Sequence, residues 1–483
     1  MSADPFASAS QLAADIRSRR LTASALVELC LERIRRHNPA LNAIVTLDEE
    51  GARRRAREAD AAAAKGEFWG PLHGLPITIK DALETAGLRT TGGHPPLKDY
   101  VPKADAPAVA RLKAAGAILL GKTNVPPLSA DYRADNPIFG RTNNPWNLAR
   151  TPGGSSGGAA AAVAAGLSVF DVGSDLAGSV RTPAHFCGLF GLKPTERRIP
   201  NTGHIPELPG QPRAVRHMNV LGPLTRSVDD LGLITKIMAG TDEAEWDVPP
   251  MPWIEAPAKA LRDCRIAWSA DFAGIPVIGE TREALGKLAN ELARAGCKVE
   301  ERNPDGFSYE LAWETWGEIA IAERKATGGE RSRERVVALN ETLGAGWAVA
   351  RGSARGLDAT VGDYAVALTR RDALISPLER FFDDWDALVC PVTVSAAIGH
   401  VPFGTPIDVD GKQVPYFIAG TAYTCPFNLT GHPGVVIPLA KSREGLPIGV
   451  QLIGKRWSEP ALLALAREVS ARAGGFRPPP AFC

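Results

Sequence analysis

The sequence predicts an α/β fold, because segments with strand and helix patterns alternate from Gly70 onward. Residues 75–80 alternate apolar and polar side chains with the period of a strand. Residues 109–115 follow with helical spacing, and 118–120 form an apolar run typical of a buried strand. The 483 residues can bury a large core and, on length alone, allow roughly two to four domains. No repeat of about 20 to 50 residues is visible, which disfavours a solenoid.

The N-terminal part predicts helices. Residues 10–38 carry apolar side chains at helical spacing, interrupted at Leu21-Thr22, where Thr22 can cap the second of two helices. Residues 49–65 are rich in Ala, Arg and Glu and predict a third helix with a basic, solvated face and no chemistry. We therefore expect residues 1–65 to be an N-terminal helical segment.

The second half predicts a further α/β part. Residues 241–260 are rich in proline and acidic side chains and indicate a connection rather than a domain end. The elements expected after it are strands at 265–268, 298–302, 387–391 and 445–454, and helices at 281–295, about 308–326, 362–385 and 459–473. One domain over residues 66–475 follows, with a catalytic core at about 70–235, the connection, a second α/β part at 261–475, and a tail at 476–483.

Composition excludes several classes of function. Lys and Arg total 55 against 54 Asp and Glu, a net charge of +1, which gives no field for nucleic acid or an anionic membrane. The seven cysteines are odd in number and lack CxxC or zinc spacing, which indicates reduced thiols in a cytoplasmic protein. No secretory signal is visible, and the longest near-apolar stretch, 159–170, is too short to span a bilayer.

Two serines, Ser155 and Ser179, each emerge from a glycine loop. Glycine lets the backbone turn sharply and approach a substrate closely, as a hydroxyl that attacks a carbonyl requires. The pair suggests a nucleophile and its proton partner, without saying which serine has which role.

Two segments match sequence motifs of other enzyme classes. The segment from Gly116 to Lys122-Thr123 fits the P-loop pattern, but 117–120 is apolar and Asn124-Val-Pro-Pro follows instead of a helix, which predicts against ATP binding. Gly153–Gly157 fits the nucleophile elbow of α/β-hydrolases, yet no hydrophobic strand precedes Ser155. The histidines available to an elbow triad are His185, His204, His217, His400 and His432, the last in a Thr-Gly-His-Pro segment that favours a turn role.

Lys80 is the alternative base. Strand alternation places Thr78 and Lys80 on one face at a strand end, where functional groups of α/β sheets usually lie. A single lysine there is usually a solvated surface residue, and a single serine such as Ser179 is more often a helix cap than a nucleophile. Only the combination of Lys80 with the two serines points to catalysis.

This combination closely resembles the amidase signature family. The matching blocks occur in the family's order at residues 74–81, 121–124, 140–145, 153–158, 173–183, 186–194, 222–226 and 427–433. The resemblance implies one domain with a central mixed β-sheet covered by helices on both faces. It also implies a cofactor-free, metal-free amidase with a Ser-Ser-Lys triad, in which Ser179 is acylated. Ser155, after a cis peptide bond, would pass the Ser179 proton to a neutral Lys80 and return a proton to the leaving amine.

Further roles come from the same resemblance. Backbone N–H groups of Leu176, Ala177, Gly178 and Ser179 would form the oxyanion hole. Supporting positions would be Ser156, Asp175 and Arg181. A buried Lys80 would have a lowered pKa, as a neutral base needs.

The chain departs from the family's pattern at three positions. Ala177 stands where many relatives have glycine, and Pro127 where relatives often have an acidic residue. Thr182 replaces the glutamine that is usual in the glutamine-dependent tRNA amidotransferase subunit, which argues against that branch. These changes concern the substrate more than the mechanism.

For substrate, we expect a small carboxylic amide, with esters and carbamates as an extension. Loops near 125–139, 200–218, 308–320 and 395–425 should wall the pocket, and their apolar content favours a neutral, hydrophobic acyl or amine group. The residues in question are Tyr132, Phe139, Ile205, Leu208, Trp313, Trp316 and Tyr423. The alternatives are nucleotide binding and a partner-dependent glutamine amidotransferase A-type subunit. The oligomeric state stays open, a homodimer being common in families of this kind.

Overall fold

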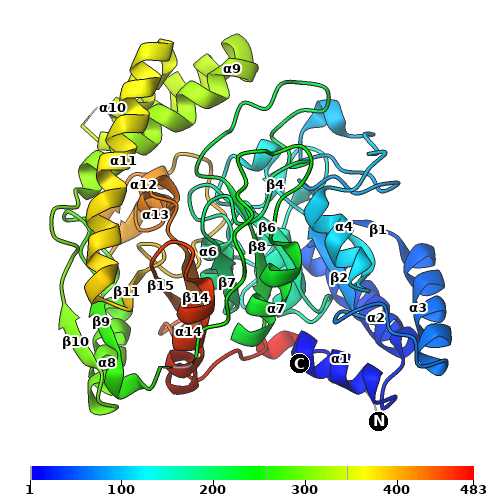
Figure 1. Cartoon of the computed structure of the whole chain (residues 1–483). Coiled ribbons are helices and arrows are strands. Elements are labelled where there is room, and N and C mark those ends of the chain that lie inside the picture. Colours follow the sequence, from blue (N-terminus) through cyan, green and yellow to red (C-terminus); the bar gives the residue numbers. More distant parts are fainter. Residues whose placement is uncertain (1–2, 258, 345) are drawn as a thin grey trace.

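An eleven-stranded mixed sheet forms the centre of the protein (Figure 1). The computed structural model describes residues 3–257, 259–344 and 346–483. Neighbouring strands pair in parallel from β3 through β2 to β6 and from β11 through β9 to β10, and the pairs between these groups are antiparallel. In sheet order the strands are β1 (Ile44–Leu47), β3 (Ile118–Thr123), β2 (Pro76–Lys80), β6 (Asp171–Asp175), β8 (Val220–Thr225), β7 (Phe190–Lys193), β14 (Gly434–Lys441), β15 (Pro447–Ile453), β11 (Ala387–Pro391), β9 (Arg265–Trp268) and β10 (Lys298–Glu301).

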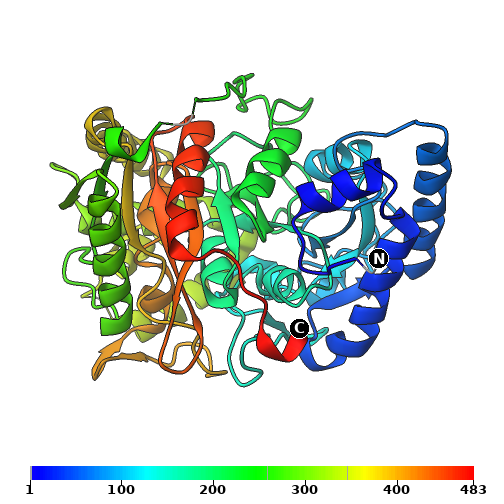
Figure 2. The ribbon, with the colours of Figure 1, turned by 90° about the horizontal axis from the view of Figure 1, so that it is seen from below.

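Helices cover both faces of this sheet (Figure 2). They are α1 (Ala9–Arg17), α2 (Ala23–Leu41), α3 (Glu49–Ala64), α4 (Pro107–Ala114), α5 (Gly157–Ala164), α6 (Arg181–Cys187), α7 (Val228–Met238), α8 (Gly279–Arg294), α9 (Tyr309–Leu343), α10 (Ala348–Asp358), α11 (Val361–Asp384), α12 (Tyr416–Thr421), α13 (Cys425–Leu429) and α14 (Glu459–Ala473). The predicted α/β class, with a mixed sheet flanked by helices, is confirmed. Across the described ranges no helix is both long and apolar enough to cross a membrane.

Some elements were not predicted from the sequence. Residues 44–47 form the edge strand β1, within the segment expected to be helical. Helix α9 extends to Leu343, well past the expected end near 326, and α10 follows it. The central strand β6 was also missed, because its sequence Asp-Val-Gly-Ser-Asp lacks an apolar pattern although every residue of it is buried.

The first helix is held by a carboxylate from α7. Asp230 is 1% exposed, and it accepts hydrogen bonds from the backbone N–H groups of Ala9 and Ser10 at 2.8 and 2.9 Å and from Ser10 Oγ at 2.6 Å. Negative charge at a helix N-terminus satisfies N–H groups that have no partner within the helix. The contact fixes α1 against α7.

We therefore expect Asp230→Ala to lower the free energy of unfolding by about 2 kcal/mol, since two N–H groups lose a charged acceptor. The matched control is Asp229→Ala on the same helix. Its side chain is 58% exposed and pairs with Arg467, so we expect a change below about 1 kcal/mol. Urea denaturation followed by circular dichroism would measure both, and equal losses in the two variants would contradict the role of Asp230.

Candidate active site

Lys80 and Ser155 meet in the interior of the protein. Lys80 is the last residue of β2 and is fully buried. Its Nζ lies 2.6 Å from Ser155 Oγ and 2.9 Å from Ser174 Oγ, and both hydroxyls are buried. Ser155 follows a cis peptide bond after Gly154, as the family resemblance implied, and lies two residues before the start of α5. The structure therefore gives this lysine two hydroxyl partners, one of them a predicted site serine.

The Ser179 loop joins β6 to α6 and is organised around Asp175. The Asp175 carboxylate accepts hydrogen bonds from the backbone N–H groups of Gly178, Val180 and Arg181 at 2.7, 3.1 and 3.3 Å. The backbone of Ser156 donates to Ser179 O at 3.2 Å, which ties this loop to the Ser155 segment. The two glycine loops thus form one unit.

Arg181 neutralises Asp175 and reaches across the sheet. Both residues are completely buried, and Arg181 Nε and Nη2 each lie 3.0 Å from an Asp175 oxygen. The same guanidinium donates to Gln451 on β15, at 2.9 Å, and to Asn428 on α13. Burial opposes ionisation of Asp175, but the charge and hydrogen bonds of Arg181 outweigh it and hold the pKa of that carboxyl below its usual range.

The predicted oxyanion donors are only partly available. The Gly178 N–H is used by Asp175, whereas those of Leu176, Ala177 and Ser179 make no hydrogen bond within the described chain. Gly178 has φ +111°, and a Cβ there would come within 2.6 Å of Thr424 Oγ1, which itself donates to Ala177 O at 2.7 Å. This position needs glycine, and three of the four predicted donors keep no hydrogen-bond partner in the described chain.

Two aspartates lie near Lys80, but neither forms a hydrogen bond with it. Asp171 accepts hydrogen bonds from Thr78 Oγ1 at 2.6 Å and Thr123 Oγ1 at 3.0 Å. Burial raises the pKa of Asp171 to about 7, although these hydrogen bonds lower it. Burial likewise lowers the pKa of Lys80 to about 7, against the attraction of Asp175 and Asp171. A substantial fraction of Lys80 is therefore neutral at physiological pH.

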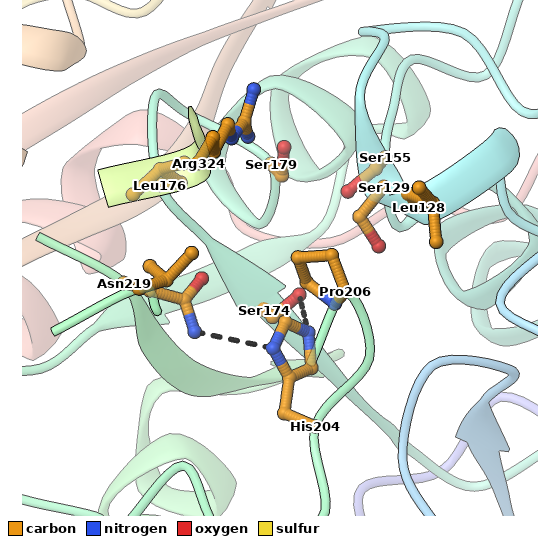
Figure 3. Close-up of a pocket in the computed structure, with 11 residues that line it drawn as sticks. Leu128, Ser129, Ser155, Ser174, Leu176, Ser179, His204, Pro206, Asn219 and Arg324 are labelled. Carbon is orange, nitrogen blue, oxygen red and sulfur yellow. Dashed lines mark hydrogen bonds between the residues drawn. The ribbon is translucent and has the colours of Figure 1, made fainter. Parts of the chain in front are cut away.

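Ser155 and Ser179 line the same pocket (Figure 3). Ser179 Oγ makes no hydrogen bond to any side chain that the structure describes. The other lining residues are Leu128, Ser129, Ser174, Leu176, His204, Pro206, Val215, Asn219 and Arg324. Two of the predicted loops, 125–139 and 200–218, contribute to this wall.

The aromatic residues expected at the pocket lie elsewhere. Tyr423 is 0% exposed, and its hydroxyl lies within hydrogen-bond distance of the backbone oxygens of Ala270 and Ile275. Trp313 is buried, and its Nε1 donates to Ala422 O. Both belong to the core, so the prediction for them was wrong. Trp316 supports the wall indirectly, since its Nε1 donates to Leu176 O at 3.1 Å.

The sequence offers His204 only as a partner for an elbow serine, and the structure gives it another place. Asn201 Nδ2 donates to Asn219 O, which orients the Asn201 amide so that its Oδ1 accepts from Asn219 Nδ2 at 2.7 Å. Asn219 Nδ2 is therefore a donor, and it also lies 3.3 Å from His204 Nδ1, which must accept. This leaves the ring proton on Nε2, 2.8 Å from Ser174 Oγ. Burial and the charge of Lys80 lower the His204 pKa to about 3, so the ring is neutral.

The two motif alternatives find no support in the geometry. Residues 118–123 form β3, and the buried Lys122 donates to Leu83 O, Thr85 and Thr90 rather than facing an open loop. Residues 144–154 form no strand before Ser155, and no histidine in the described ranges bonds to Ser155 or Ser179. The described part of the chain contains no group of His, Cys, Asp and Glu side chains that could hold a metal ion.

Comparison with known proteins decides the family. A family model described as Amidase matches residues 25–463. The chain belongs to the amidase signature family. An indoleacetamide hydrolase of Bradyrhizobium diazoefficiens is 36% identical to this amidase over 97% of the chain and 86% of the relative. The A-type subunit of the glutamyl-tRNA(Gln) amidotransferase of Roseiflexus sp. (strain RS-1) is also 36% identical, over 92% of each chain. The solved structure of a bacterial aryl acylamidase superposes with a TM-score of 0.80 at 26% identity, covering 97% of this chain and 96% of that one.

Family membership establishes the class of reaction. The protein is a hydrolase that acts on amide C–N bonds of small-molecule substrates. The relatives include both free-standing amidases and amidotransferase subunits, so the family alone does not fix the substrate.

The amidase fold should depend strongly on Asp175. We expect Asp175→Asn to lower the free energy of unfolding by about 3–5 kcal/mol, because it leaves the Arg181 charge buried and uncompensated. The control Asp383→Asn removes a carboxylate that is 62% exposed and pairs with Lys455, and should cost less than about 1 kcal/mol. Chemical denaturation of both variants is the measurement, and a loss at Asp175 no larger than at Asp383 would contradict the prediction.

Proposed function

We propose that this amidase hydrolyses carboxylic amides through an acyl-enzyme on Ser179, with Ser155 as proton relay and Lys80 as base. The observation that carries the proposal is the 2.6 Å contact between Lys80 Nζ and Ser155 Oγ, in a buried site whose pocket Ser179 also lines. A lysine with a pKa near 7 can accept a proton at neutral pH. Among the described residues, no carboxylate lies within hydrogen-bond distance of Lys80 Nζ. Such a carboxylate would hold the lysine in its protonated form.

The proton path closes over one catalytic cycle. Ser155 passes its proton to neutral Lys80 and takes the proton of Ser179, whose oxygen attacks the amide carbonyl. The N–H groups of Leu176, Ala177 and Ser179 stabilise the oxyanion. Collapse breaks the C–N bond, while Ser155 gives its proton to the leaving amine and recovers one from Lys80. A water molecule then repeats the sequence on the ester of Ser179 and releases the acid.

For the substrate, we propose amides with a neutral, hydrophobic aryl or alkyl amine, and esters or carbamates as further substrates. Beside Ser155 the pocket is uncharged, with the apolar Leu128 and Pro206 among its lining residues. The similarity to an indoleacetamide hydrolase and to an aryl acylamidase supports aryl-containing amides.

The second candidate is an amidotransferase A-type subunit that needs partner chains, which the similarity to such subunits favours. Thr182 opposes it, because the usual glutamine is absent and the Thr182 hydroxyl faces Gly420 O at 3.5 Å. Hydrolysis of a simple anilide by the purified chain alone would count against this candidate.

The first test concerns the nucleophile. Ser179→Ala should abolish covalent labelling by a fluorophosphonate and nearly all hydrolysis, whereas Ser155→Ala and Lys80→Ala should fold and be severely slowed. Labelling can be followed by mass spectrometry of the intact protein. Retained labelling in Ser179→Ala, with loss only in Ser155→Ala, would support the elbow alternative and overturn these roles.

The second test concerns the base. Only neutral Lys80 accepts a proton, so kcat/KM for a substrate without ionisable groups should rise with pH through about 7 and level off above it, falling about tenfold per pH unit well below 7. Asp171 also has a pKa near 7, and Asp171→Asn, which removes its titration, should keep a limb of the same sign. A flat profile between about pH 6 and 8.5, or loss of the limb in Asp171→Asn, would rule out Lys80 as the titrating base.

A further inference from the structure

We propose that Arg324 binds an anionic group at the far end of the substrate's acyl chain. The inference rests on the proposed function and refines its substrate class to half-amides of dicarboxylic acids, or amides with an equivalent terminal anion. Arg324 lies on α9 and is the one formally charged residue among those lining the pocket of Ser155 and Ser179. None of the lining residues is acidic.

The Arg324 guanidinium has no counter-ion in the described part of the chain. Among the described residues, no Asp or Glu side chain lies within salt-bridge distance of it and no group forms a hydrogen bond with it. Burial lowers its pKa below the ordinary value, against a weak attraction from Glu323, so the charge is incompletely solvated. Arginine nevertheless keeps its proton and offers several N–H donors in a geometry suited to a carboxylate.

The adjacent carboxylate is occupied elsewhere. Glu323 accepts hydrogen bonds from Tyr364 OH at 2.7 Å and the Arg216 N–H at 2.9 Å, and lies 2.6 Å from His217 Nδ1. These contacts occupy the carboxylate of the one acidic residue in this helical turn. The Arg324 guanidinium is therefore available to a group bound in the pocket.

The position of Arg324 assigns the anion to the acyl side. Figure 3 shows Arg324 beside Leu176 and Ser179, whereas Leu128 and Ser129 lie beside Ser155. In the proposed cycle Ser155 protonates the leaving amine, so the amine occupies the Ser155 end and the acyl chain points toward Arg324. Ser129 Oγ is buried without a hydrogen-bond partner in the described chain, which leaves one hydroxyl to meet the uncharged amine end.

The test uses two pairs of substrates. In the first, N-succinyl-4-nitroanilide carries a terminal carboxylate in its acyl part, and N-(4-oxopentanoyl)-4-nitroanilide replaces that carboxylate with a methyl ketone of similar size. In the second, N-butanoyl-4-aminobenzoate and N-butanoyl-4-acetylanilide make the same change in the amine part. Steady-state kinetics are measured for the wild type, Arg324→Met, Arg324→Lys and the control Lys325→Met, which removes an exposed positive charge one residue away.

We expect the wild type to favour the succinyl substrate by about 10- to 100-fold in kcat/KM, the usual range for a hydrogen bond to a charged group. Arg324→Met should lose this preference mainly through a higher KM, while Arg324→Lys keeps part of it and Lys325→Met all of it. The second pair should show no Arg324-dependent preference. Equal use of the first pair by the wild type, or an unchanged ratio in Arg324→Met, would overturn the proposal.

Binding separates this inference from the proposed function. If the wild type hydrolyses no anilide, the proposed function has failed, and calorimetric titration with succinamate tests Arg324 by itself. Binding weakened about tenfold or more in Arg324→Met, and unchanged in Lys325→Met, supports the anion site. Binding that does not depend on Arg324 overturns it.

Discussion

A buried lysine whose hydrogen-bond partners are hydroxyls is the constraint on which the site depends. Lys80 is completely enclosed and contacts Ser155 and Ser174, although two aspartates lie on the adjacent strand β6. A carboxylate paired directly with Lys80 would keep it protonated and useless as a base. The fold avoids this by binding Asp175 to Arg181 and Asp171 to two threonines.

The same arrangement joins distant parts of the chain. Asp175 shapes the loop that carries Ser179, and Arg181 connects it to Asn428 and Gln451, which are more than two hundred residues away in sequence. The central antiparallel strands bring these segments together, since β14 pairs with both β7 and β15. The geometry of the loop that carries Ser179 therefore depends on both halves of the sheet.

The sequence predicted which polar side chains come together better than it predicted the walls of the pocket. Lys80, Ser155 and Ser179 could be named as candidates because each lies in a motif whose local glycine or strand pattern has a physical reason, and their catalytic roles remain a proposal. Strand β6 could not, since it lacks an apolar pattern and its buried Asp171 and Ser174 bond to side chains that come from other segments of the chain. Trp313 and Tyr423 were misplaced because an aromatic side chain looks the same in sequence whether it faces a core or a pocket. Arg324 lies in a long helix with no motif, and its surroundings become visible only in three dimensions.

The roles proposed for Lys80 and Arg324 also constrain each other. A negatively charged substrate that entered next to Lys80 without compensation would stabilise the protonated lysine and raise its pKa, reducing the fraction of active base. In the proposed site, pairing the substrate anion with Arg324 would remove most of that field, because the bound pair is neutral. Neutral His204, held as the Nε2–H tautomer by Asn219, likewise adds a hydrogen-bond donor to Ser174 without adding charge. If Arg324 binds the anion as proposed, the pocket accepts an anionic acyl group while Lys80 still titrates near neutrality.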